Sequence, residues 1–132
     1  MKYIMGNATE ILLLLFLMIV FLQSGADKIV DWKGNLSFLK THFANTPMKN
    51  MVPFLMAVIT VCESATGILC TLGLIQIITF EKNTLAFYGA ILACISLLML
   101  LFGQRLAKDY AGAQTIAIYF VSAIFLVFLL QD

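Results

Sequence analysis

Long apolar stretches and short polar segments alternate along the chain. Four apolar stretches cover about residues 8–29, 53–78, 85–102 and 113–130. A helix that crosses the hydrocarbon core of a bilayer needs roughly 17–25 predominantly apolar residues, and each stretch is long enough. The pattern therefore predicts an all-α membrane protein, built as a bundle of four transmembrane helices.

The polar segment between the first two stretches, about residues 31–44, has a helical pattern of its own. Its apolar side chains recur at spacings of four, three and four residues: Trp32, Leu36, Leu39 and Phe43. Lysines and other polar residues occupy the remaining faces, which is typical of an amphipathic helix. Between two spans such a helix lies in the membrane interface, and we expect Trp32, Lys33 and Lys40 to anchor it among the headgroups.

Composition supports a membrane protein and limits what it can do. Of the 132 residues, 62% are hydrophobic and 11% are charged, whereas about a quarter of a soluble domain is charged. The spans and the amphipathic segment use most of the chain, so we interpret residues 1–132 as one membrane domain without catalytic activity of its own. A net charge of +1 indicates no surface for nucleic acid.

Lysine and arginine are unevenly divided between the two sides of the predicted bundle. The connections between spans one and two and between spans three and four hold Lys28, Lys33, Lys40, Lys49, Arg105 and Lys108, and the other side holds Lys2 and Lys82. The positive-inside rule places the lysine-rich connections in the cytoplasm and both termini outside.

Few residues in the sequence are suited to bind a metal or a redox cofactor. Cys62, Cys70 and Cys94 lie in apolar stretches and form no C-x-x-C pair, so we expect buried, free thiols. His42 is the single histidine, and we expect it in solvent or among headgroups. We therefore predict no metal site, and a bound quinone is the cofactor that the residues allow.

Glu63 is the most unusual residue in the spans. It lies about ten residues inside the second apolar stretch, near the middle of the membrane, where a charge is costly and usually faces the bundle interior with a partner. Burial favours its neutral acid, which can donate a hydrogen bond. Three roles are open for Glu63: a structural tie between helices, a proton site or a ligand contact.

Residues that could pair with Glu63 lie at the ends of other spans. Lys28 closes span one, and Gln104 and Arg105 close span three, with Tyr110 shortly after. Each cation can also extend to the headgroups. A cluster of these residues with Glu63 would suit an anionic or quinone-like headgroup.

Three short segments together resemble the DoxX-like family of small four-helix bacterial membrane proteins. They are "FLQSGADKIVDW" at the end of span one, "CESATGILCTLGL" in span two and "FGQRLAKDYAGA" before span four. The resemblance implies a location in the bacterial inner membrane and marks Lys28, Glu63, Arg105 and Tyr110 as family-like positions. The family is named for a subunit of a thiosulfate:quinone oxidoreductase, and other members are associated with redox-stress complexes or with the maturation of other enzymes.

Three functions are compatible with these features. The leading one is an accessory subunit that stabilises or anchors a larger membrane complex, with a polar intramembrane pocket around Glu63 and with membrane lipids and other protein subunits as partners; the other two are alternatives to it. The second is a quinone-linked redox subunit in which Glu63 exchanges protons. The third is a small carrier of a lipid or metabolite.

Overall fold

The computed structural model describes residues 6–131 and confirms the predicted all-α architecture. Four of its helices are long and apolar enough to cross a membrane: α2 (Ala8–Val30), α4 (Val52–Phe80), α5 (Thr84–Leu106) and α6 (Tyr110–Leu130). The shorter helix α3 (Trp32–His42) lies between the first two spans, as the amphipathic pattern predicted. The observed spans are somewhat longer than the predicted ones, most of all α5, which continues through Gly103, Gln104 and Arg105 to Leu106.

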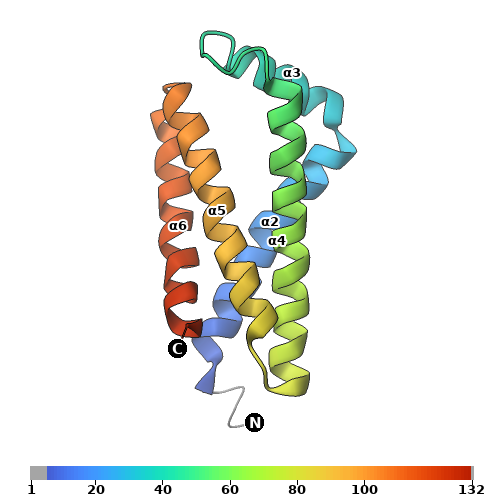
Figure 1. The fold of residues 1–132 in the computed structure, drawn as a ribbon, viewed down its shortest axis with the longest axis vertical. Helices are drawn as coiled ribbons and strands as arrows, with labels where there is room; N and C mark the ends of the chain where they lie inside the picture. Colours follow the sequence, from blue (N-terminus) through green and yellow to red (C-terminus); the bar gives the residue numbers. More distant parts are fainter. Residues whose placement is uncertain (1–5, 132) are drawn as a thin grey trace.

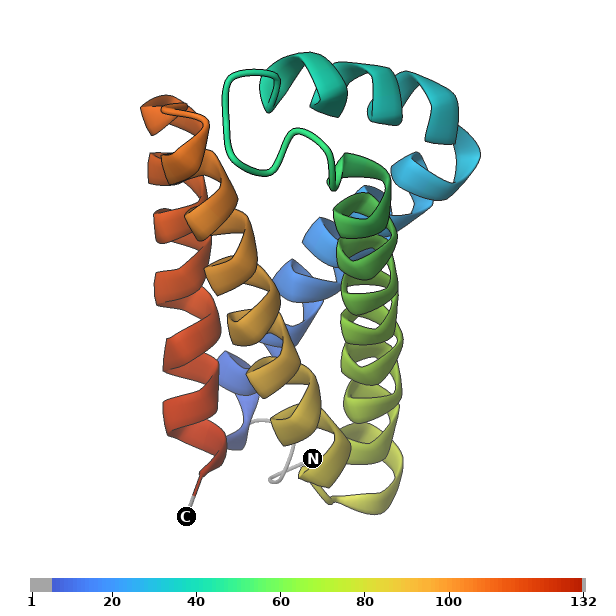
Figure 2. The same cartoon turned by 45° about the horizontal axis from the view of Figure 1, so that its top comes forward.

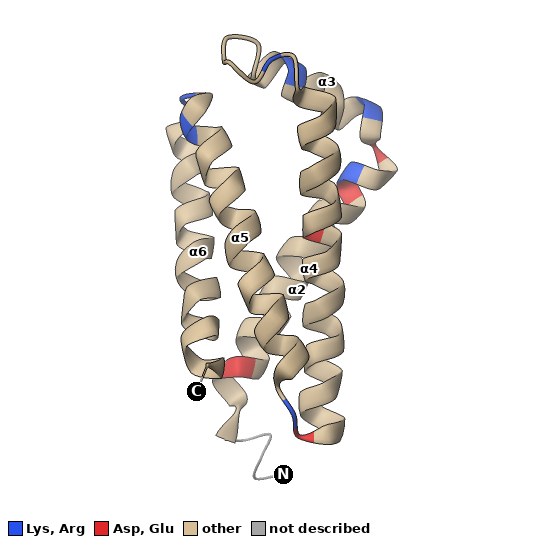
Figure 3. Cartoon of the chain, viewed as in Figure 1, with Lys and Arg blue, Asp and Glu red and all other residues tan. Residues whose placement is uncertain are grey.

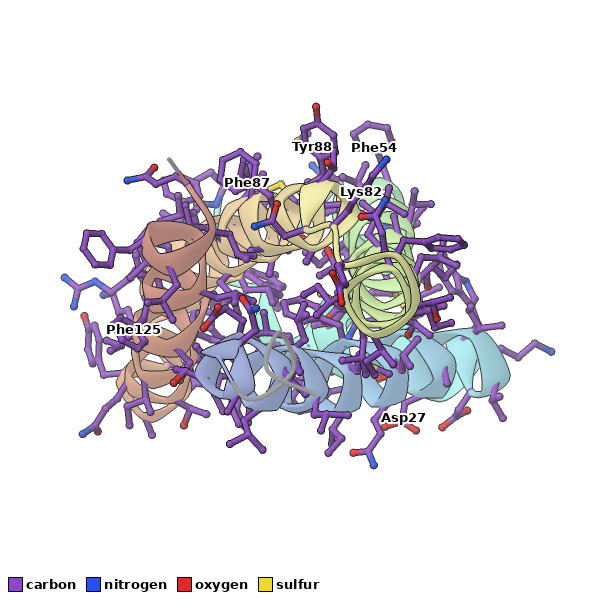
Figure 4. All side chains as sticks on the ribbon, turned by 90° about the horizontal axis from the view of Figure 1, so that it is seen from below. Asp27, Phe54, Lys82, Phe87, Tyr88 and Phe125 are labelled. Atoms are coloured by element: carbon purple, nitrogen blue, oxygen red, sulfur yellow. The ribbon has the colours of Figure 1, made fainter. Side chains whose placement is uncertain are left out.

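The spans pack in the order α2, α4, α5, α6, each mainly against its neighbour in this order. Helix α2 is strongly inclined to the others and reaches α6 near its own beginning (Figure 1). Seen along the bundle, α2 lies beside α4 and passes beneath α5 towards α6 (Figure 4). The core consists of aliphatic, alanine and cysteine side chains together with Phe21, and Leu14, Leu17 and Phe21 of α2 are fully buried.

Helices α4 and α5 approach most closely near the short turn that joins them. A Cβ added to Gly73 would lie 2.6 Å from the backbone of Ala86, and one added to Gly89 would lie 3.1 Å from the backbone nitrogen of Cys70. Small residues let helix backbones meet where no hydrophobic force drives association. From this contact the two helices diverge towards the end of the bundle that carries α3 (Figure 1).

Helix α3 lies across this open end (Figure 2). The carboxylate of Asp31 caps it by accepting a hydrogen bond from the backbone N–H of Gly34 at 3.2 Å. The amide of Asn35 donates to the backbone carbonyls of Asp27 and Asp31, which fixes the bend between α2 and α3. The four residues of the predicted apolar stripe are half-buried: Trp32, Leu36, Leu39 and Phe43. Lys33 and Lys40 are exposed, so the amphipathic segment turns its apolar face to the bundle.

Apart from Glu63 in the middle of α4, charged residues gather at the two ends of the bundle (Figure 3). Of the lysines and arginines in residues 6–131, only Lys82 lies at the end opposite α3. Helix α2 begins and α6 ends at that same end. The charge asymmetry expected from the sequence therefore corresponds to the two ends of the folded bundle.

Candidate functional site

A buried polar contact joins the end of α2 to the middle of α4. Glu63, with 3% of its side chain exposed, lies with Oε1 2.8 Å from Nζ of Lys28. The hydroxyl of Ser24 donates to Glu63 Oε2 at 2.6 Å and accepts a hydrogen bond from Lys28 Nζ at 2.8 Å. Three side chains from two helices thus form one closed group, with opposite charges in contact.

The local sequence explains why these side chains meet. Ser24 and Lys28 are four residues apart and share one face of α2. Gly25 lies between them, and a Cβ there would lie 2.8 Å from the hydroxyl of Ser64, so α2 and α4 are in close contact at this level. Glu63 lies about 17 Å along α4 from its first residue. The close contact brings an ammonium to a carboxylate that lipid could not solvate.

A cavity of about 280 Å³ lies beside this group, where α4 and α5 diverge beneath α3. Apolar side chains make most of its wall, and polar groups from α2, α3 and α5 are part of it. The lining residues are Lys28, Asn35, Phe38, Leu39, His42, Phe43, Met48, Val52, Leu55, Met56, Val58, Ile59, Met99, Leu100, Gly103 and Gln104. We name this cavity the α3 pocket. Lys28 belongs both to the α3 pocket and to the contact with Glu63.

His42 links α3 to the end of α5. Its Nε2 lies 2.8 Å from Oε1 of Gln104, a hydrogen bond in which the ring N–H donates to the amide oxygen. Asp109 Oδ2 is 3.7 Å from the same nitrogen. The imidazole stacks on Phe38, with ring centroids 5.4 Å apart, and meets Phe43 edge-on at 5.0 Å. The sequence predicted a position in solvent or among headgroups, and the structure shows an imidazole that is largely enclosed, with 16% of the side chain exposed.

The structure separates the residues that the sequence analysis placed in one cluster. Lys28 and Glu63 are in contact, and Gln104 lines the α3 pocket. Arg105 is exposed instead, and its guanidinium carbon lies 5.0 Å from the ring centroid of Tyr110, which is 55% exposed. Consecutive helical residues point about 100° apart, so Gln104 and Arg105 face different surroundings. Arg105 and Tyr110 therefore lie on the surface of the bundle and do not line the α3 pocket.

Two polar residues of the site were not identified from the sequence. Ser24 stands four residues before Lys28, a spacing that could have marked it as part of the same helix face. His42 directly precedes Phe43, the last residue of the apolar stripe, and its contact with Gln104 spans 62 residues of sequence. That contact depends on how α3 folds back over the bundle, which the local pattern around His42 and Phe43 does not encode.

The cysteines are free thiols: Cys70 and Cys94 are buried and Cys62 is partly buried. Among residues 6–131, no group of three or more His, Cys, Asp or Glu side chains is arranged to hold a metal ion. No family model, curated protein or solved structure matches the chain. The chemistry of the α3 pocket and of the Glu63 group is the basis for a functional assignment.

Proposed function

We propose that this multi-pass membrane protein binds a small amphiphilic molecule in the α3 pocket. The observation that supports the proposal is the lining of the pocket: apolar walls from α4 and α5, with Lys28, His42 and Gln104 supplying polar groups. Ligand sites are concave, mostly apolar and equipped with a few polar groups that orient the guest. The apolar part of the guest would lie between α4 and α5, with its head against the polar groups.

The volume limits the part of the guest that is enclosed. The 280 Å³ of the α3 pocket is near the lower end of the roughly 300–1,000 Å³ typical of small-molecule sites. A single ring or the upper part of one chain fits such a volume, and a complete two-chain lipid does not. Met99 of the wall is 37% exposed, so a longer tail can continue into the surrounding bilayer.

The charge at the polar end favours a neutral head. The ammonium of Lys28 is already paired with the Glu63 carboxylate, so its charge is compensated inside the protein. It still has N–H donors for a carbonyl or hydroxyl oxygen, because an ammonium carries three and Ser24 accepts one. A quinone and a neutral lipid both belong to this class.

Native mass spectrometry of the protein released from membranes in mild detergent tests the proposal. Ile59 lines the pocket and is 9% exposed, whereas Val61, on the same helix, is 68% exposed. We expect a non-covalent adduct of small mass on the unmodified protein and on Val61→Trp, and its loss in Ile59→Trp. An adduct retained by Ile59→Trp would contradict the proposal.

The accessory-subunit function rests on the small size of the chain and its lack of cofactor ligands, and the bacterial inner-membrane location rests on the resemblance to the DoxX-like family. Both stay predictions. Purification in mild detergent from the native membrane tests the first of them. Stoichiometric protein partners are the expected result, and a self-contained homo-oligomer would count against it. A quinone-linked redox role predicts a quinone in the organic extract of the purified protein. This quinone should be absent from the extract of Ile59→Trp, the variant that loses the pocket adduct.

A further inference from the structure

Helices α4 and α5 pack in a register that places Ser96 at the level of Glu63. The contact of Gly73 with Ala86 and that of Cys70 with Gly89 are both antiparallel pairs, three residues apart on each helix. Continuing this register by alternate steps of three and four residues pairs Thr66 with Ala93, then Glu63 with Ser96. All four of these residues are buried, as a continuous helix interface requires.

Two polar atoms at this level are buried without a hydrogen bond. In the part of the chain that the structure describes, they are Oε1 of Glu63 and Oγ of Ser96, and no other buried side-chain nitrogen or oxygen lacks one. Lys28 Nζ lies 2.8 Å from Oε1, but this charge contact does not have the angles of a hydrogen bond. Ser96 is 0% exposed. An unbonded polar group in such a place is costly, so its partner needs to be identified.

The threonine hydroxyls of the neighbouring span α4 behave differently from the hydroxyl of Ser96. Thr60, Thr66 and Thr71 of α4 each donate to the backbone carbonyl four residues earlier, at 2.7–2.8 Å. This local bond is the usual way to satisfy a hydroxyl in a membrane helix. Ser96 makes no such bond, so its hydroxyl is available to a molecule between α4 and α5.

We propose that Ser96 and Glu63 hold a hydroxyl group between α4 and α5. Its O–H donates to Oε1 of Glu63, and its oxygen accepts from the Ser96 hydroxyl, so both atoms gain the hydrogen bond that they lack. A water molecule supplies this chemistry, and so does the hydroxyl end of an amphiphile. The site lies one helical turn deeper than Ile59 and Leu100 of the α3 pocket. It extends the polar group of Lys28, Ser24 and Glu63 to a third helix, and it does not require a ligand in the pocket.

The sign of a stability change provides the first test. Ser96→Ala removes the hydroxyl without changing the backbone, and Thr66→Val is the control because it removes a buried hydroxyl that already has a partner. If Ser96 holds a guest, Ser96→Ala lowers the Tm in detergent by more than Thr66→Val does. A Tm that stays the same or rises in Ser96→Ala overturns the proposal, since deleting an unbonded buried hydroxyl is neutral or stabilising.

Solid-state NMR in bilayers provides a second test that identifies the guest. In glutamate-labelled protein, the Glu63 carboxyl signal is assigned by its loss in Glu63→Gln. We expect magnetisation from water protons to reach this carbon at short mixing times. The transferred intensity should be several-fold lower in Ser96→Ala than in the unmodified protein, and unchanged in Thr66→Val. Transfer that appears only after extraction of co-purified lipid assigns the hydroxyl to a pocket amphiphile and retains the site. If the transfer does not depend on Ser96, either before or after extraction of the lipid, the site is overturned, and this result does not bear on the pocket adduct.

Discussion

Lys28 and Glu63, 35 positions apart in the sequence, meet with Nζ 2.8 Å from Oε1 at the crossing of α2 and α4. Both side chains are largely shielded from solvent, with 16% and 3% exposed. An isolated charge in this environment is costly, and a paired one with further hydrogen bonds is tolerated. The pair therefore fixes the angle of α2 against α4. It also compensates the charge of Lys28, which lines the α3 pocket.

Breaking the pair from one side is expected to destabilise the bundle more than removing it entirely. Lys28→Met leaves the Glu63 carboxylate without a counter-charge and is expected to cost about 3 kcal/mol of unfolding free energy. Lys28→Met combined with Glu63→Leu removes both charges and is expected to cost less than Lys28→Met alone. Equilibrium unfolding in mixed micelles measures both, with the exposed Lys33→Met as control. A double variant less stable than Lys28→Met would contradict a mutually compensating pair.

The close contact of α4 and α5 predicts a strong effect of a single methyl group. A Cβ at Gly73 would lie 2.6 Å from the backbone of Ala86, which cannot move aside like a side chain. Gly73→Ala is expected to destabilise the protein by about 1–3 kcal/mol through overpacking. Gly6, which has open space around it, provides the control Gly6→Ala. Equal thermal stability of the two variants would show that the helices are not in contact at Gly73.

The contact between His42 and Gln104 predicts a local effect on α3. Gln104→Leu removes the acceptor of the 2.8 Å hydrogen bond, which contributes about 1 kcal/mol to holding α3 over the α3 pocket. We expect faster amide hydrogen exchange throughout α3 and unchanged exchange in α4. The exposed Gln114→Leu serves as the matched control on α6. Unaltered exchange in α3 would mean that this bond does not hold the helix.

The distribution of cations predicts which side of the membrane each end faces. Lys33 lies at the lysine-rich end, which the positive-inside rule places in the cytoplasm, and Lys82 lies at the other end. In sealed cells a membrane-impermeant maleimide is expected to label Lys82→Cys and to spare Lys33→Cys. The native cysteines lie within the spans, and the unmodified protein measures their background. The reverse labelling pattern would invert the assigned orientation.

The secondary structure of this protein is largely determined by patterns that can be read locally. The length of each apolar stretch predicts its span, and the spacing of Trp32, Leu36, Leu39 and Phe43 predicts α3 and its half-buried apolar face. Glu63 stands out because a carboxylate among apolar residues needs a partner in the protein.

The tertiary contacts of the site depend on how the helices cross, which a single sequence does not specify. Lys28, Gln104 and Arg105 were equally plausible neighbours of Glu63, since all three lie at the ends of spans. The inclination of α2 selects Lys28, and the rotation of α5 turns Gln104 to the α3 pocket and Arg105 outward. Ser96 looks like an ordinary small residue of α5 until the register of α4 and α5 places it opposite Glu63.

Photocrosslinking in the native membrane tests whether the α3 pocket holds an amphiphile. Phe43 lines the pocket, and Phe54 of α4 is 64% exposed and points away from the bundle (Figure 4). Each is replaced in turn by p-benzoylphenylalanine, and intact masses are measured after irradiation. We expect one dominant small-molecule adduct at position 43 and a broad distribution of bulk lipids at position 54. The same lipid distribution at both positions, or no adduct at position 43, would contradict the proposal.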